Sequence, residues 1–149
     1  MKRQQGFTII ELIVVIVVLG ILAATAIPRF ANIGTEARIA SMQGVAGSMN
    51  SAREVIRAKW YAAGSNTVGT VTTVDGTSVA VTTGTGATAG MPTAAGMVNA
   101  ISVSSGISCA AAGAVTTCNP TGFATCTVTY TDTTGAVSTA GAVTANCGG

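Results

Sequence analysis

The sequence predicts an α+β fold, in which a long N-terminal helix precedes a small antiparallel β-sheet head with a disulfide-stapled C-terminal region. Three observations support this prediction. Apolar residues run almost without interruption from Phe7 and then recur at helical spacing as far as Trp60. An Asp75-Gly76 pair lies between two runs of β-branched residues, which is a strong hairpin signal. All four cysteines lie at or after Cys109.

The segment from Phe7 to Ile27 is apolar enough to cross a membrane. As a helix rising 1.5 Å per residue it spans roughly 31 Å, which is about the thickness of a bilayer core. Lys2 and Arg3 precede it, so the N-terminus is expected to stay in the cytoplasm while the rest of the chain is exported. The exceptions to its apolar character are Thr8, Glu11, Gly20 and Thr25.

Glu11 is the single charged side chain within this segment. A carboxylate at the centre of a membrane helix costs about 2.5–3.5 kcal/mol on insertion scales. An ionisable group inside a membrane span is therefore a functional hypothesis by default. Glu11 is the first candidate functional residue of the chain.

Two other interpretations of this N-terminus remain open. An ordinary secretory signal peptide would have Lys2 and Arg3 in its basic region and Ala24-Thr25-Ala26 as its cleavage site. A permanently anchored membrane protein would keep the same helix. Glu11 argues against the signal peptide, because a charged residue is unfavourable inside its apolar core.

A second helical pattern follows Pro28 and is amphipathic. Pro28 has no backbone N–H, so it is expected to kink or interrupt the helix at its own position. Gly20 weakens the first helical segment by about 1 kcal/mol relative to alanine. The polar face of the second pattern includes Glu54, three residues before Arg57. The predicted apolar face consists of Phe30, Ile33, Ala37, Ala40, Val45, Met49, Ala52, Ile56 and Trp60.

The rest of the chain is predicted to form a β-rich head. Gly64 is suited to end the helix, because glycine adopts the left-handed conformation common at helix C-termini. Phe123–Thr131 alternates apolar and hydroxyl side chains, as a half-buried strand does. The other expected segments are strands at Thr67–Val74, Thr77–Thr82 and Ala136–Ala145, a turn at residues 132–135, and an irregular or weakly helical stretch at Pro92–Ser102.

Four cysteines in an exported chain indicate two disulfides. Three pairings are possible, and the sequence does not select one of them. A zinc site is the alternative, but spacings of nine, eight and twenty-one residues match no zinc motif and the chain has no histidine. No metal or cofactor is therefore expected. The cysteines are Cys109, Cys118, Cys126 and Cys147.

Charged side chains are scarce in the head. After Tyr61 the only ones are Asp75 and Asp132. A head without basic residues does not fit nucleic-acid binding. The chain also contains no histidine, no motif with an activated nucleophile and no acidic pair at a recognisable spacing. No catalytic residue is assigned, and the chain is not expected to be an enzyme.

The first thirty residues resemble the class III leader of type IV prepilins, in the short-leader type IVa group. They also resemble the MSHA (mannose-sensitive haemagglutinin) branch of major pilins in Gram-negative aquatic bacteria. The resemblance covers about a fifth of the chain and is generic beyond Phe30. The matching positions are Lys2, Arg3, Gly6, Phe7, Thr8, Glu11, Gly20 and Pro28.

This resemblance implies a type IV pilin fold and assigns roles to individual residues. It implies prepilin peptidase cleavage between Gly6 and Phe7, and methylation of the new Phe7 amine. It further implies that Glu11 pairs with such an amine to set axial register, and that Gly20 and Pro28 loosen the helix inside a filament. The implied domains are a cleaved leader (1–6), a transmembrane or filament-core helix (7–28), an amphipathic helix (29–61) and a β-rich head (62–149).

The implied function is that of the major structural subunit of a type IV pilus for adhesion and surface attachment, with motility left open. The partners would be further copies of the chain in a helical polymer, the inner membrane before assembly, and the prepilin peptidase/methylase with the assembly machinery. The subunit would reside in the inner membrane of a Gram-negative bacterium and then in a surface filament. The alternative is a major pseudopilin of a type II secretion system. The cysteine-rich C-terminal region and the scarcity of carboxylates for a Ca²⁺ loop favour the pilin.

Overall fold

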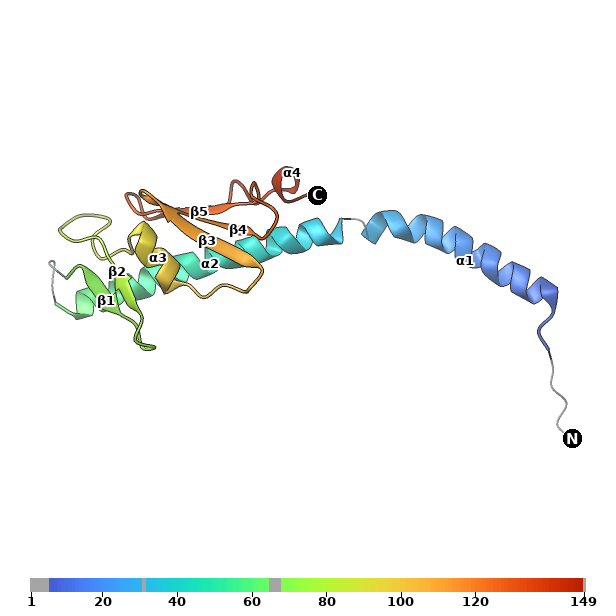
Figure 1. Ribbon diagram of the computed structural model, residues 1–149, viewed down its shortest axis with the longest axis horizontal. Coiled ribbons are helices and arrows are strands. Elements are labelled where there is room, and N and C mark those ends of the chain that lie inside the picture. The colour runs from blue at the N-terminus through green and yellow to red at the C-terminus, as the bar shows by residue number, and fades with distance from the viewer. Residues whose placement is uncertain (1–5, 31, 65–67, 149) are drawn as a thin grey trace, which may run out of the picture. The chain divides into compact units, whose positions relative to one another are not determined.

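The computed structural model describes residues 6–30, 32–64 and 68–148, which divide into two compact units between Gly34 and Thr35 (Figure 1). Side chains of residues 27–30 are outside the description. The elements in chain order are α1 (Ile9–Phe30), α2 (Ile33–Ala62), β1 (Thr70–Thr72), β2 (Ser78–Ala80), α3 (Ala94–Ala100), β3 (Ile107–Ala112), β4 (Val115–Pro120), β5 (Val128–Thr131), β6 (Ala136–Ser138) and α4 (Thr144–Cys147).

Helix α1 continues through Pro28, which corrects the expectation of an interruption at that residue. It ends at Phe30, and α2 begins at Ile33. A proline removes only its own N–H from the hydrogen-bond ladder, and helices in apolar surroundings often tolerate that loss. The boundary between the two helices therefore lies slightly beyond the position expected from Pro28.

Helix α2 buries one face along most of its length, but this face is rotated from the predicted one. Val45, Met49, Ile56 and Trp60 are buried as expected. The sequence pattern missed Met42 and Ala46, which are also buried. Three residues of the predicted face are exposed, because in the first two turns the head covers the side of α2 that carries Thr35 and Arg38 instead: Ile33, Ala37 and Ala40. The side chain of Phe30 lies outside the described residues.

The head packs on α2 through two separate hydrophobic clusters. The first, which we call the sheet cluster, lies over the middle of α2 and includes Met42, Met49, Val128 and Tyr130. The second, the hairpin cluster, lies at the C-terminal end of α2 and consists of Ile56, Trp60, Val71, Val79, Val81 and Ala89. Helix α2 thus contributes to both cores. Figure 1 shows the strands and α3 of the head lying along this helix.

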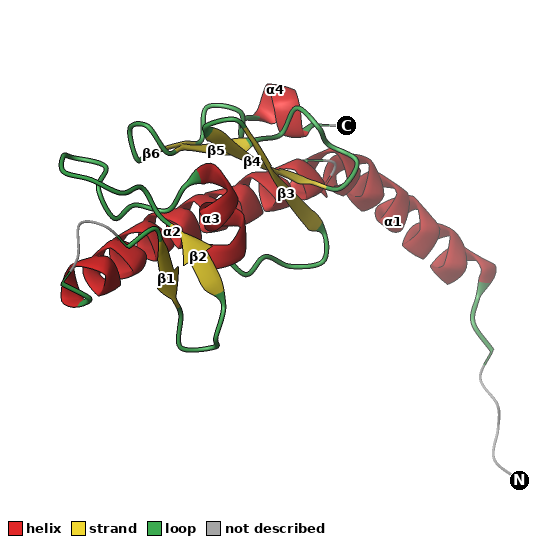
Figure 2. Ribbon diagram, turned by 60° about the vertical axis from the view of Figure 1, so that its left-hand side comes forward, coloured by secondary structure: helices red, strands yellow, loops and turns green. Residues whose placement is uncertain are grey.

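A four-stranded antiparallel sheet, in the order β3-β4-β5-β6, forms the larger part of the head (Figure 2). Strands β3 and β4 were not predicted. The expected strand at Phe123–Thr131 is confirmed only from Val128, because Phe123–Cys126 forms a turn in which the Cys126 N–H donates to the Phe123 carbonyl at 3.1 Å. The expected returning strand is limited to β6, and the helical tendency of Pro92–Ser102 appears as α3.

Strands β1 and β2 form the hairpin predicted around Asp75-Gly76. Their register pairs Thr72 with Ser78, and Gly76 takes a φ of +84° that favours glycine. The predicted helix end is also confirmed, since α2 stops at Ala62 and Gly64 has a φ of +70°. Local turn chemistry is therefore sufficient to place both features.

The disulfides join neighbouring cysteines in the sequence. Cys109 pairs with Cys118 across β3 and β4, where the two residues are direct partners in the register. Cys126 pairs with Cys147 at the end of α4. The C-terminal loop is also fastened to α2, because Arg38 donates from Nε to the Cys147 carbonyl at 2.7 Å. Since all four sulfurs are bonded in pairs, they are not available as zinc ligands.

Tyr130 gives the sheet cluster a pH dependence. Its hydroxyl donates to the Pro92 carbonyl at 2.6 Å, and the side chain is fully buried. Burial, assisted by the negative charge of Asp132 and opposed by Arg53, raises the pKa of Tyr130 from 10.0 to about 12. The neutral phenol is thus favoured in the folded state over a range where the unfolded chain ionises.

We therefore expect the contribution of Tyr130 to the free energy of unfolding to be constant below pH 10 and to decrease as the pH rises from 10 to about 12. Urea unfolding of the detergent-solubilised protein at pH 9 and pH 11 measures this loss. In Tyr130→Phe the decrease in the free energy of unfolding between pH 9 and pH 11 should be smaller than in the wild type. The variant is less stable at pH 9, because the Pro92 carbonyl loses its hydrogen-bond donor. Tyr61→Phe, at an exposed site, is the control. An unchanged alkaline loss in Tyr130→Phe would contradict the assignment.

Candidate assembly helix

The first turn of α1 is closed by reciprocal hydrogen bonds between Thr8 and Glu11. The Thr8 backbone N–H donates to Glu11 Oε2 at 2.9 Å, and the Thr8 hydroxyl donates to the same oxygen at 2.7 Å. The Glu11 N–H points back to Thr8 Oγ1 at 3.4 Å. This is a capping box, in which threonine at the N-cap and glutamate three residues later satisfy each other's backbone donors.

The capping box gives Glu11 a second role that the sequence interpretation missed. Thr8 was identified only as a matching position of the leader, although Thr-x-x-Glu before an apolar run is itself a recognisable signature. In a single subunit the carboxylate therefore already has a hydrogen-bond partner within its own helix. This reduces the penalty of holding Glu11 in apolar surroundings before any other subunit is present.

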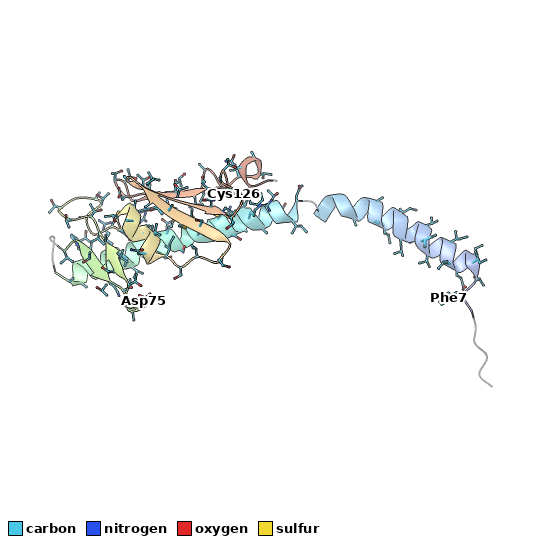
Figure 3. All side chains as sticks on the ribbon, viewed as in Figure 1. Phe7, Asp75 and Cys126 are labelled. Carbon is cyan, nitrogen blue, oxygen red and sulfur yellow. A yellow bond between two sulfur atoms is a disulfide. The ribbon has the colours of Figure 1, made fainter. Side chains whose placement is uncertain are left out.

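The predicted cleavage point lies just ahead of the helix. Gly6, Phe7 and Thr8 have no regular secondary structure and are exposed. Phe7 is 92% exposed, and Figure 3 shows it at the start of α1. Because Gly6 precedes it, the Phe7 nitrogen is here an uncharged amide. A positive partner for Glu11 at this nitrogen would exist only after cleavage.

Helix α1 exposes apolar side chains all round. Its segment Ile9–Ala26 is long and apolar enough to cross a membrane, with a mean hydropathy of 2.9. Phe7, Ile10, Val14 and Val15 surround Glu11 and line a shallow apolar depression of about 380 Å³. A helix that is apolar on every side requires either lipid or other apolar helices around it.

The two predicted helix-loosening residues lie within the regular part of α1. Gly20 is helical, and a side chain added there would contact no other residue. No contact within the subunit therefore requires glycine at this position, and the missing side chain leaves a small gap on the helix surface. Pro28 is likewise helical in backbone conformation. A loss of helicity between these two residues stays a prediction for the assembled state.

Comparison with known proteins places the motif in context. Residues 1–27 match the family model of the prokaryotic N-terminal methylation motif. A type IV narrow pilus major component of Thermus thermophilus is 46% identical over 50 residues, which is 34% of this chain and 43% of that protein. A type IV major fimbrial protein of Dichelobacter nodosus is 41% identical over 51 residues, covering 34% of this chain and 33% of that protein.

A fimbrial protein of Pseudomonas aeruginosa is 60% identical over 30 residues, which is 20% of each chain. The chain thus spans less than half the length of the curated relatives it matches. No solved structure matches it. The similarity confirms the type IV pilin resemblance, while the narrower resemblance to the MSHA branch stays a prediction.

Proposed function

We propose that this chain is the precursor of a major type IV pilin, the structural subunit of a surface filament. The observation that carries the proposal is α1, an exposed apolar helix with a single carboxylate near its start, inside a matched N-terminal methylation motif. The names of the similar proteins, which are major pilus and fimbrial subunits, support the same conclusion. A structural subunit of this kind is not an enzyme.

Before assembly the subunit resides in the inner membrane, and on assembly its α1 moves from the lipid into a bundle of identical helices. This transfer exchanges one apolar environment for another, so the hydrophobic effect provides little net driving force. Helix packing and polar contacts must supply the difference. Cleavage after Gly6 by a prepilin peptidase, with methylation of Phe7, creates an amine that Glu11 can pair with across subunits. That charge pair fixes the axial register of one subunit against the next.

The head remains on the outside of the filament and provides its surface. Only Asp75 and Asp132 are charged after Tyr61, so this surface presents hydroxyl and small apolar groups. We propose adhesion and attachment to surfaces as its task, in a Gram-negative bacterium. The assembly machinery and the leader peptidase are the subunit's other partners.

A pseudopilin of a type II secretion system is the alternative, and it is not favoured. The similar proteins described above are major pilus and fimbrial subunits. The two disulfides of the head also fit a surface filament exposed to proteases and oxidising conditions.

The test is to shear cells that express the chain, pellet the released filaments and measure the intact mass of the subunit. We expect the mass of Phe7–Gly149 plus one methyl group and minus the four hydrogens lost in two disulfides. A Gly6→Leu variant is the control, because a side chain at this position meets no other residue of the fold. It should keep the full leader and release no filaments.

Other outcomes would overturn parts of the proposal. A processed subunit that stays with the cell envelope, with an empty sheared fraction, would support the pseudopilin. A secreted chain that begins at Ile27 would mean that the apolar segment is a conventional signal peptide.

A further inference from the structure

The tip of the β1–β2 hairpin presents a bare apolar side chain. Val74 is 96% exposed, more than Phe7 on the unassembled helix. The turn that carries it is well ordered by hydrogen bonds. The Thr73 N–H donates to the Thr77 carbonyl at 2.9 Å, and the Gly76 N–H donates to the Thr73 carbonyl at 3.1 Å. A rigid turn that displays valine to solvent is preorganised to insert it elsewhere.

A carboxylate adjoins this valine. Asp75 Oδ1 accepts hydrogen bonds from the Thr73 hydroxyl and from the Thr77 N–H, the latter at 3.4 Å. These bonds lower the pKa of Asp75, so its carboxylate is charged at neutral pH. Asp75 Oδ2 makes no hydrogen bond with the described residues, and Asp75 is an exposed residue. Figure 3 shows Asp75 at the projecting end of the hairpin.

A groove on the same head has complementary character. It consists of two cavities, of about 230 and 300 Å³, that share Ser41, Ser104 and Ile107. It runs between the N-terminal half of α2 and the segment that leads from α3 into β3. Small residues on α2, among them Gly44, which has no side chain, keep it open. Serines alternate in its lining with Val45, Val103 and Ile107, and this apolar part can accept a valine-sized side chain.

Arg38 supplies the opposite charge at one end of this groove. Its Nε and Nη2 donate to the Cys147 carbonyl and to Thr35 Oγ1. The guanidinium also lies 3.9 Å from the centre of the Phe123 ring. In the described part of the chain Nη1 has no hydrogen bond, so it can receive a carboxylate. The head beyond α2 has two acidic side chains, Asp75 and Asp132. The carboxylate of Asp132 accepts a hydrogen bond from the Ala94 N–H, so Asp75 is the one that can pair with a neighbouring copy.

The tip and the groove lie at different ends of α2, so one copy cannot fill its own groove. The hairpin packs on Ile56 and Trp60, whereas the groove is centred near Ser41. Ile56 and Ser41 are roughly 22 Å apart along the helix at 1.5 Å per residue. A contact between tip and groove therefore joins unlike surfaces, and a contact of that type repeats without closing.

From these observations we propose that the Val74-Asp75 tip of one copy docks into the Ser41–Ser104 groove of a second copy, with Asp75 facing Arg38. The proposal rests on the proposed function, since it describes a contact between heads in the same filament. It adds a specific link outside the helical core. It also gives the head a direction, with the tip as donor and the groove as acceptor.

Disulfide cross-linking tests this contact. Cells expressing Val74→Cys together with Ser104→Cys are sheared, and the pelleted filaments are oxidised mildly and run on a non-reducing gel. We expect a ladder of dimers, trimers and longer species, because each copy both donates a tip and accepts one. The matched control pairs Thr85→Cys, on an exposed loop near the same end of α2, with Ser104→Cys. It should remain monomeric.

The other results would overturn the proposal. Filaments that contain only monomers show that the tip is not in the groove, and dimers alone show a two-fold contact. A ladder in the Thr85 control shows that the contact is not specific. If wild-type cells release no filaments at all, the proposed function fails first, and this contact fails with it.

A second variant covers the case in which the cysteine pair yields no filaments. Val74→Asp puts a charge on an exposed turn and should leave the head folded. In the docked pair it would place a second carboxylate beside Val45, Val103 and Ile107 without a partner, because Arg38 already faces Asp75. We expect the yield of sheared filaments to fall about tenfold or more, which corresponds to about 1.4 kcal/mol. Thr85→Asp should keep the wild-type yield. Equal yields from the two variants would contradict the docking.

Discussion

Replacing Glu11 by alanine is expected to give a subunit that is cleaved and methylated but poorly assembled. Removing one member of a buried charge pair costs about 3–5 kcal/mol, because the other charge is left without a partner. In the filament the unpaired charge would be the amine of Phe7. The yield of sheared filaments should therefore fall by about two orders of magnitude or more at 1.4 kcal/mol per factor of ten. Glu11→Val should behave in the same way.

The capping box provides a control that separates two roles of Glu11. Glu11→Gln keeps an oxygen that can accept from the Thr8 N–H and hydroxyl, but it removes the charge. If register depends on the charge pair, the glutamine variant should also assemble poorly while its helix start stays intact. Comparison of sheared and whole-cell fractions by immunoblot, with intact mass to verify processing, gives the result. Normal assembly of Glu11→Gln would assign the role of Glu11 to helix capping alone.

Loss of the Cys126–Cys147 disulfide is expected to be the most damaging change in the head. In the chain-entropy model its loop, with a separation of 21 residues, contributes about 3.4 kcal/mol, compared with about 2.7 kcal/mol for the separation of 9 in Cys109–Cys118. Both Cys126 and Cys147 are fully buried, so serine at these positions also places hydroxyls in the sheet cluster. The C-terminal loop would in addition hold less firmly to Arg38.

The measurement is urea unfolding of the Cys126→Ser/Cys147→Ser double variant beside Cys109→Ser/Cys118→Ser, both in detergent. We expect the first to lose more stability and to become sensitive to proteases near its C-terminus. Cys109 is half-buried although its partner Cys118 is fully buried, and six register pairs join β3 to β4, so the second variant is the matched comparison. The reverse order of stabilities would show that the cross-strand bond, not the C-terminal one, holds the head together.

The sequence predicts features that depend on neighbours in the chain. The apolar run, the Asp75-Gly76 turn and the Gly64 helix end each arise from local conformational preferences. The candidate site is predicted in the same way, because Glu11 is conspicuous in an apolar segment. Its hydrogen bonds to Thr8 could also have been predicted, since the capping signature spans only four residues.

Features that depend on distant parts of the chain were missed. Strand β3 reads Ile-Ser-Cys-Ala-Ala-Ala, which carries little β-propensity, and it exists because β4 pairs with it and a disulfide crosses the pair. The clamp from Arg38 to the Cys147 carbonyl joins residues 109 positions apart. The rotation of the buried face of α2 toward Met42 likewise follows from where the sheet lies, which helical periodicity alone does not specify.

If the chain forms the proposed filament, the division of the head into two clusters along α2 leads us to expect a particular response to mechanical load. Neither disulfide includes a residue of α2, so tension along α2 acts on both clusters through non-covalent contacts, and the hairpin cluster is the smaller of the two. We therefore expect β1 and β2 to detach from α2 before the sheet does, because the sheet is also held by hydrogen bonds from Arg38 and Arg53, while residues 109–118 and 126–147 cannot extend beyond their closed loops. A pulled fibre would lengthen in a small first step and then stiffen.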